Sequence, residues 1–298
     1  MIPGIAGYWL VMGKIRIGIS GWSYKEWKGG FYPDDLSDDD YLEYAASVFD
    51  TIEINGTFYS LTDPATCRRW REAAPHGFQY AVKGSRYITH NKRLNDPRTA
   101  LANFFASGIL DLGERLGPIL WQLPQNFSFD GKRLNAFLQM LPRDTEAAAD
   151  LARGHDGRVE DVSYGPGDRH RVRHVLEIRH ESFLRPEMAR IAQHHGIALC
   201  SSHSSKWPYI EETTAGLIYL RLHGPGKLYA SQYSDSDLDW WANRIRTWER
   251  GGNPDDAERI SDLDPPSRKE RDVYVYFDNT AQGHAPRNAQ QLMDRVSE

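Results

Sequence analysis

The sequence is poor in cysteine, and it has neither a long apolar run nor an excess of positive charge. Its two cysteines, Cys67 and Cys200, lie far apart and form no CxxC pair. Neither a disulfide framework nor a zinc site is therefore indicated, and both are expected to be small buried residues. The net charge of -5 disfavours a broad electrostatic grip on nucleic acid or on an anionic membrane, although a local basic patch is compatible with it.

The first residues carry no recognisable targeting signal. Residues 1–13 are apolar, but they lack a basic beginning and a small-residue cleavage pattern, and they are too short to span a bilayer. We expect a cytoplasmic protein without a membrane partner, in which residues 1–14 are an N-terminal extension and residues 15–298 form one domain. The composition is that of a soluble globular protein, with 40% hydrophobic and 26% charged residues and many aromatics.

Segments with the two-residue period of strands alternate with segments of helical period along the chain. Helix starts are marked by Asp63-Pro64, by Asp96-Pro97 and by Ser234 with Asp237. The length and the order of elements predict an α/β fold: a single TIM-type (β/α)8 barrel rather than an open doubly wound sheet, for which no glycine-rich phosphate motif is present. The expected strands are residues 15–20, 51–55, 78–83, 117–122, 174–179, 197–201, 217–223 and 272–277.

Three segments depart from this rhythm. Residues 202–215 show no helical period, so the sixth helix is expected to be short or missing. Residues 143–173 and 251–271 are polar insertions before strands five and eight, rich in Gly, Asp, Arg and Pro. Because each insertion lies between a helix and the following strand, we place both at the end of the barrel opposite the active-site end, where they would affect assembly more than chemistry.

Strand parity predicts which side chains point into the barrel. In strand five Leu176 and Ile178 face the helices, so Glu177 and Arg179 face inward. The polar residues selected in this way lie at the C-terminal strand ends, where barrel enzymes keep their active sites. They are Ser20, Glu53, Asn55, Lys83, Gln122, Glu177, Arg179, Arg221 and His223, with Asp278 or Asn279 from strand eight; we select Asn279.

The charge and the aromatic content of this end predict a small, polar, anionic ligand. Lys83, Arg179 and Arg221 outnumber Glu53 and Glu177 by one. Guanidinium groups suit bidentate recognition of carboxylate or phosphate, and aromatic loops suit sugars or other flat polar ligands. The loop residues expected to help bind it are Trp22, Tyr24, Tyr59, Arg86, His90, Trp207 and Tyr229.

Several motifs at the strand ends resemble the YecE-like family, also catalogued as domain of unknown function 72. The resemblance covers about residues 15–296 and implies a TIM-type barrel, but it implies no established reaction. One departure is that residues 201–203 read SSH where an acidic residue is expected, which disfavours a mechanism needing a carboxylate there. The motifs are 18–24 GISGWSY, 53–59 EINGTFY, 81–83 AVK, 87–90 YITH, 122–124 QLP, 177–180 EIRH, 221–224 RLHG and 274–277 YVYF.

The leading functional hypothesis is a cofactor-independent enzyme that applies general acid/base chemistry to a phosphorylated or carboxylated, sugar-like substrate. Glu177 or Glu53 would be the base, and Lys83 or His223 the acid or electrostatic stabiliser. Arg179 and Arg221 would clamp the anion, while Asn55 and Gln122 would orient hydroxyl groups.

Three alternatives stay open. The first is a metal-dependent hydrolase of phosphate esters or nucleic acid, with a divalent metal ion held by ligands from Glu53, His90, Glu177, His203 and His223. The second is a non-catalytic protein that binds a nucleotide or single-stranded nucleic acid. The third is that the inward-facing charges form a structural ion-pair network that closes the barrel.

Overall fold

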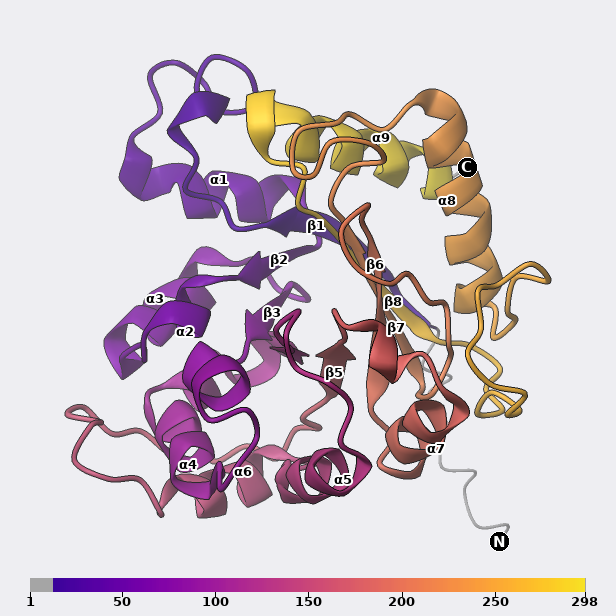
Figure 1. Cartoon of the computed structure of the whole chain (residues 1–298). Helices are drawn as coiled ribbons and strands as arrows, with labels where there is room; N and C mark the ends of the chain where they lie inside the picture. Colours follow the sequence, from indigo (N-terminus) through magenta and orange to yellow (C-terminus); the bar gives the residue numbers. More distant parts are fainter. Residues whose placement is uncertain (1–12, 298) are drawn as a thin grey trace, which may run out of the picture.

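The computed structural model describes residues 13–297, and its centre is a closed barrel of eight parallel strands. Each strand pairs with the next, and β8 closes on β1, which confirms the TIM-type barrel (Figure 1). Of the predicted N-terminal extension, only Gly13 and Lys14 lie within the described residues. The strands are β1 (Ile15–Ser20), β2 (Thr51–Ile54), β3 (Gln79–Lys83), β4 (Leu116–Gln122), β5 (His174–Glu177), β6 (Ala198–His203), β7 (Leu217–Leu222) and β8 (Asp272–Phe277).

Helices surround the barrel, and several begin where the sequence places a cap. Asp63 accepts a hydrogen bond from the Thr66 backbone, and Ser234 with Asp237 forms a full capping box. Among the described residues no helix has the length and apolar character needed to cross a membrane. The helices are α1 (Tyr41–Val48), α2 (Gly56–Tyr59), α3 (Pro64–Ala73), α4 (Arg98–Ala106), α5 (Gly131–Met140), α6 (Thr145–Ala152), α7 (Pro186–His194), α8 (Asp235–Glu249) and α9 (His284–Ser297).

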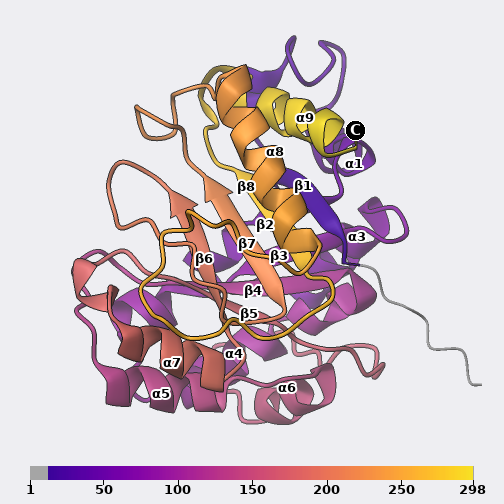
Figure 2. The same ribbon diagram turned by 90° about the vertical axis from the view of Figure 1, so that its right-hand side faces the viewer.

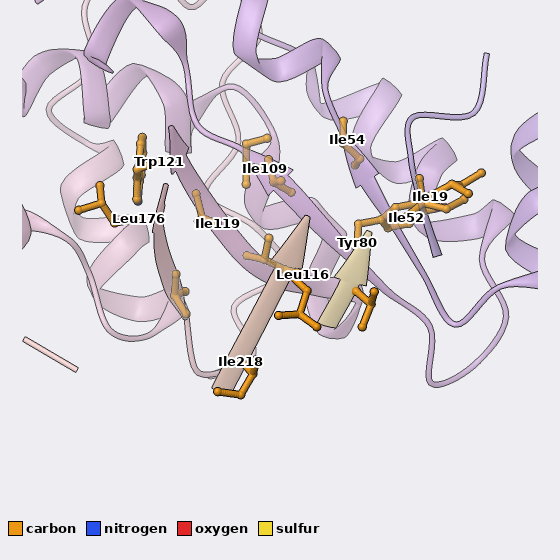
Figure 3. Close-up of a cluster of buried hydrophobic side chains, with 14 of the residues drawn as sticks. Ile19, Ile52, Ile54, Tyr80, Ile109, Leu116, Ile119, Trp121, Leu176 and Ile218 are labelled. Carbon is orange, nitrogen blue, oxygen red and sulfur yellow. The ribbon is translucent and has the colours of Figure 1, made fainter. Parts of the chain in front are cut away.

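Alternation along the strands divides the hydrophobic core into two layers. One parity packs between barrel and helices, as Ile52, Ile119 and Leu176 do in Figure 3. The other parity fills the barrel interior with a smaller cluster, which includes Val175 and Tyr219. The interior cluster is Ala81, Leu120, Val175, Ala198, Cys200, Ala215, Leu217, Tyr219, Tyr274 and Tyr276. Both cysteines are buried and unpaired.

The sixth helix is missing, as predicted, and the second insertion covers the gap. Between β6 and β7 the chain is irregular, and it carries the buried residues Glu211 and Glu212. Glu211 accepts a bond from the Glu258 amide, and Glu212 accepts bonds from the amides of Ile260 and Ser261. Residues 251–271 therefore dock onto the β6–β7 connection, and Figure 2 shows this segment looping across the sheet between α7 and α8.

Local details differ from the sequence-based expectation in three places. The predicted loop after β2 opens with a helical turn, α2, and the first insertion contains helix α6, capped by Asp144 and packed against α4. Strand β5 ends at Glu177, two residues earlier than predicted.

Gly18 shows how tightly β1 and β2 approach. A Cβ atom added there would lie 1.7 Å from the Thr51 carbonyl oxygen, whereas nothing lies within 4 Å of one added at Gly56. We expect Gly18→Ala to lower the free energy of unfolding by about 2–3 kcal/mol, the usual cost of overpacking. Gly56→Ala should change it by less than about 1 kcal/mol. Urea titration of both variants measures this, and equal stabilities would contradict the close packing.

Candidate functional site

Polar side chains from the C-terminal strand ends meet inside the barrel, at the end that we call the mouth. Glu53 stands beside Ser20 in the β1–β2 register, Gln122 beside Glu177 in β4–β5, and Ser202 beside Arg221 in β6–β7. Because the register aligns these positions and their side chains point inward, residues distant in sequence form one polar layer.

Arg221 is the centre of this layer and is 1% exposed. Its Nη2 atom is 2.8 Å from Glu53 Oε2 and 3.0 Å from Asp278 Oδ2, and its Nη1 atom is 3.2 Å from Glu177 Oε2. Its Nε atom also donates to Glu53, at 3.0 Å. Three carboxylates therefore share one buried guanidinium, so its nitrogens are engaged by protein groups rather than open to an external anion.

Glu53 and Glu177 are both fully buried and fully bonded. Glu53 accepts from Ser20 Oγ at 2.7 Å and from the Tyr219 hydroxyl at 3.1 Å, besides Arg221. Glu177 accepts from Gln122 Nε2 at 2.9 Å and from Arg179 Nε at 2.8 Å.

Burial alone would raise the pKa of Glu177, but the charges of Arg179 and Arg221 outweigh it and hold this pKa well below its usual range. A carboxylate in this state is a weak base.

His223 and Asp278 form a second close pair. His223 Nδ1 lies 3.0 Å from Asp278 Oδ2, but the two atoms are not aligned for a hydrogen bond. On the other side of the ring, His223 Nε2 lies 3.1 Å from Ser202 Oγ. Burial and the charge of Arg221 lower the pKa of His223, so its imidazole is neutral at pH 7.

Lys83 is the exception in this layer. It is the last residue of β3, its side chain has the inward parity, and it is 8% exposed. No described side chain forms an ion pair with its ammonium group. Its Nζ atom instead rests 4.4 Å from the centre of the Phe58 ring, a cation–π contact. Burial and the charge of Arg221 lower the pKa of Lys83 to about 8. Lys83 can therefore exchange a proton near neutral pH.

Arg179 and His90 lie beside Lys83 at the rim of the mouth. Arg179 stacks on Trp207, with its Cζ atom 3.8 Å from the ring centre, and both residues line a pocket of about 510 Å³. His90 belongs to a π-helical turn, residues 87–91, after β3. Burial and the charges of Lys83 and Arg179 lower the pKa of His90 to about 4, so it is neutral at pH 7.

The aromatic residues predicted for the mouth differ in how they are placed. Trp207 Nε1 donates to Ser202 Oγ at 2.7 Å, and the Tyr24 hydroxyl donates to the Ser20 carbonyl at 2.8 Å. Tyr229 packs edge-on against His223, whereas Trp22 packs against Trp70. Tyr59, at the end of α2, and Arg86, before the π-helical turn, are exposed. Asn55 donates to Ser20 Oγ at 3.0 Å.

The end of strand β8 contributes Asp278, rather than Asn279, to the pairing of Arg221. Asn279 is buried, and its Nδ2 atom donates to Ser231 and Asn288, away from the arginine centre, whereas Asp278 joins it. Strand parity predicts which residue after β8 faces inward. Tyr274 and Tyr276 belong to the inner cluster, so the next inward position is Asp278. The same parity from Cys200 leads to Ser202, which bonds Glu177, His223 and Trp207.

The ligands named for the metal alternative do not all converge. His203 Nδ1 lies 2.8 Å from the Tyr233 hydroxyl, and its ring packs against Trp241 on the helix side of the barrel. Within residues 13–297, no three His, Cys, Asp or Glu side chains are grouped so that they could hold a metal ion.

Comparison with known proteins gives consistent matches over nearly the whole chain. Residues 16–298 match the family described as protein of unknown function DUF72. The UPF0759 protein YunF of Bacillus subtilis is 22% identical over 94% of this chain and 94% of its own length. The UPF0759 protein YecE of Escherichia coli K12 is 30% identical over 38% of this chain and 39% of its own length.

Solved structures share the fold. The crystal structure of a DUF72 family protein from Thermotoga maritima superposes with a TM-score of 0.70 at 25% identity, covering 95% of this chain and 99% of that one. A DUF72 family protein from Enterococcus faecalis gives a TM-score of 0.67 at 16% identity, covering 96% of each chain.

The unusual pKa of Lys83 can be measured directly. We expect its reaction with an amine acylating reagent to rise with pH around a midpoint near 8, because only the neutral amine reacts and the pKa of Lys83 is about 8. Peptide mapping by mass spectrometry at pH 6–11 gives the profile, with a free lysine peptide as the reference. A midpoint near 10.5, the value of an unperturbed lysine, would contradict it.

Removing Arg221 tests the central pairing. Arg221→Met should lower the free energy of unfolding at pH 7 by about 3–5 kcal/mol, because it leaves buried carboxylates without their cation. The pKa values of Glu177 and Asp278 are lowered, so this stability is complete above about pH 5 and is lost as the pH falls through the folded values. Urea unfolding at several pH values should show that the difference in free energy of unfolding between the unmodified protein and Arg221→Met becomes smaller in acid. The exposed Arg98→Met is the control.

Proposed function

The chain belongs to the family described as protein of unknown function DUF72, and since that description names no reaction, we propose a function from the mouth itself. We propose an enzyme that needs no bound cofactor and applies general acid/base chemistry to a small, polar, anionic substrate, phosphorylated or carboxylated and sugar-like, at the C-terminal strand ends.

The observation that carries this proposal is the contrast between Arg221 and Lys83. Arg221 is bonded on all sides by carboxylates, whereas Lys83, on the same inner layer, has no ion-pair partner among the described residues and a pKa of about 8. A purely structural network would be expected to pair both cations, because a buried unpaired charge destabilises the fold. An unpaired amine that titrates near neutrality is instead typical of a catalytic group.

Lys83 would carry out the proton transfer. The neutral amine takes a proton from the substrate, and the resulting ammonium returns a proton later in the cycle. Between these steps the ammonium stabilises negative charge that develops on the substrate. The neutral imidazole of His90, which lies nearby, would offer a hydrogen bond without adding a charge.

Arg179 would hold the anionic end of the substrate. Two of its nitrogens lie 2.8 Å from Glu177 Oε1, which fixes the guanidinium plane at the wall of the 510 Å³ pocket. Its Nη1 atom is left to face a ligand, and Arg86 on the rim would add a second positive charge. Lys83 does not line this pocket, so its volume does not describe the space beside the amine.

Glu53, Glu177 and Arg221 would position the reacting groups rather than react themselves. Their hydrogen bonds are already satisfied, and the pKa of Glu177 is too low for an effective base. This transfers the role of base, which the sequence suggested for Glu177 or Glu53, to Lys83. His223 would support the wall of the site through Ser202 and Trp207.

The two other candidate functions have less support. A metal-assisted hydrolase would need oxygens of Glu53 and Glu177 that are bonded to arginines. A nucleobase-binding module would need an open aromatic face, but Trp207 is 8% exposed and Arg179 lies over its ring.

The test is turnover of a panel of phosphorylated and carboxylated sugars in D2O, followed by NMR for substrate loss or deuterium uptake. We expect Lys83→Met to lower kcat at least about 100-fold without loss of thermal stability, because the proton-transfer group is gone. The rate of the unmodified protein should rise with pH toward a plateau above about 8. The exposed Lys132→Met is the control, and undiminished turnover in Lys83→Met would refute the proposal.

A further inference from the structure

A second group of charged residues lies at the opposite end of the barrel, around the N-terminal strand ends. Arg16 is the second residue of β1, and Arg173 directly precedes β5. Arg143 and Arg171 come from the first insertion, and Arg268 comes from the second. We call Arg16, Arg143, Arg171, Arg173 and Arg268 the arginine cluster. It does not follow from composition, because the chain as a whole carries a net charge of -5.

Four arginines of the cluster line two adjoining pockets. A pocket of about 450 Å³ is lined by Arg16, Arg171 and Arg173, and one of about 240 Å³ is lined by Arg143, Arg171 and Arg173. Gly216 also lines the smaller pocket, and the guanidinium of Arg268 reaches within 3.1 Å of the place where a Cβ atom of Gly216 would stand. The two polar insertions thus bring their arginines to the same concave surface.

The acidic side chains at this surface are too few to neutralise the cluster. Asp272 lies between Arg173, which donates to it, and Arg16, whose Nη1 atom is 3.9 Å away. Glu114, the other carboxylate lining these pockets, pairs with Arg115 outside the cluster. Asp50 lines a further pocket together with Arg16, and it is the second carboxylate near that arginine. Among the described residues, Arg143, Arg171 and Arg268 make no side-chain hydrogen bond or ion pair, although three cations crowd one another here.

Arg16 is an independent sign that this surface takes a ligand. Its side chain is 10% exposed, it lines the larger pocket, and its buried Nη1 atom has no hydrogen-bond partner. A buried guanidinium nitrogen without an acceptor is costly, and a ligand oxygen would remove that cost. Burial and the charges of Arg173 and Arg268 also lower the pKa of Arg171, which reflects the mutual repulsion that an anion would relieve.

We propose that the arginine cluster is a binding site for the di- or triphosphate group of a small molecule, separate from the mouth. Guanidinium groups bind phosphate oxygens in pairs, and the several oxygens of a polyphosphate can engage several arginines at once. The concave pockets of about 450 and 240 Å³ suit a compact ligand better than a polymer laid across a surface.

Helix ends give these arginines a competing, structural role. Residues 142–143 follow α5, and cations are favourable near helix C-termini. That role predicts a loss of stability on substitution and no binding of anions. Phosphate binding predicts that substitution of Arg171 weakens anion binding and leaves the stability unchanged. Arg171 is exposed and bonded to no described side chain.

Calorimetric titration of the full chain with pyrophosphate, and separately with orthophosphate, tests the proposal. Pyrophosphate should bind more tightly, and Arg171→Ala should weaken it at least tenfold with the melting temperature unchanged. Arg143→Ala, from the other wall of the smaller pocket, should weaken it as well. The matched control Arg98→Ala, an exposed arginine at the start of α4, should bind as the unmodified protein does.

The variant Lys83→Met distinguishes pyrophosphate binding at the arginine cluster from binding at the mouth. If pyrophosphate binding is kept in Lys83→Met and lost in Arg171→Ala, the arginine cluster holds the ligand, whether or not the mouth is catalytic. Three results would overturn the proposal. The first is binding that is lost in Lys83→Met and kept in Arg171→Ala, the second is no binding at millimolar pyrophosphate, and the third is an equal loss of binding in Arg98→Ala. Tighter binding of a single-stranded oligonucleotide without terminal phosphates would assign the cluster to nucleic acid instead.

Discussion

The mouth of this barrel depends on the burial of one guanidinium among three carboxylates. Glu53, Glu177 and Asp278 come from three different strands or strand ends, and each reaches Arg221. Ionised groups can stay in a barrel interior only when their charges and hydrogen bonds are matched. The positions of β2, β5, β7 and the end of β8 are therefore tied to one side chain, and the surrounding hydroxyl and amide groups complete its shell.

The structure removes the charge excess that the sequence displays, because Asp278 joins the mouth as a third carboxylate beside its three cations. Counting residues treats Arg221 and Lys83 alike, but the folded protein bonds one completely and leaves the other over an aromatic ring. Glu53 and Glu177 look reactive in the sequence, but buried hydrogen bonds already engage their oxygens. The proposed reactivity accordingly centres on Lys83, which has no ion-pair partner among the described residues, with the neutral His90 beside it.

The sequence was sufficient for the barrel, its strands, the missing sixth helix and most inward-facing residues, because strand parity and helix caps are local patterns. Strand parity alone favours Asp278 over Asn279, because Tyr274 and Tyr276 face inward and residue 278 is the next position of that parity. The partners of Arg221 were beyond prediction, since they depend on the relative heights of strands in the barrel. Helix α6 was hidden in a polar segment whose apolar residues are mainly alanine.

The docking of residues 251–271 onto the β6–β7 connection has a consequence for the order of folding. In most sectors of the barrel, the covering helix follows its strand directly, so each sector can be covered as soon as it is synthesised. Glu211 and Glu212 instead obtain their partners from residues 258–261, about fifty residues later in the chain. Such a long loop must close before this sector is sealed. During synthesis the flank of β6 therefore stays uncovered until α8 and the segment after it, up to residue 261, have emerged.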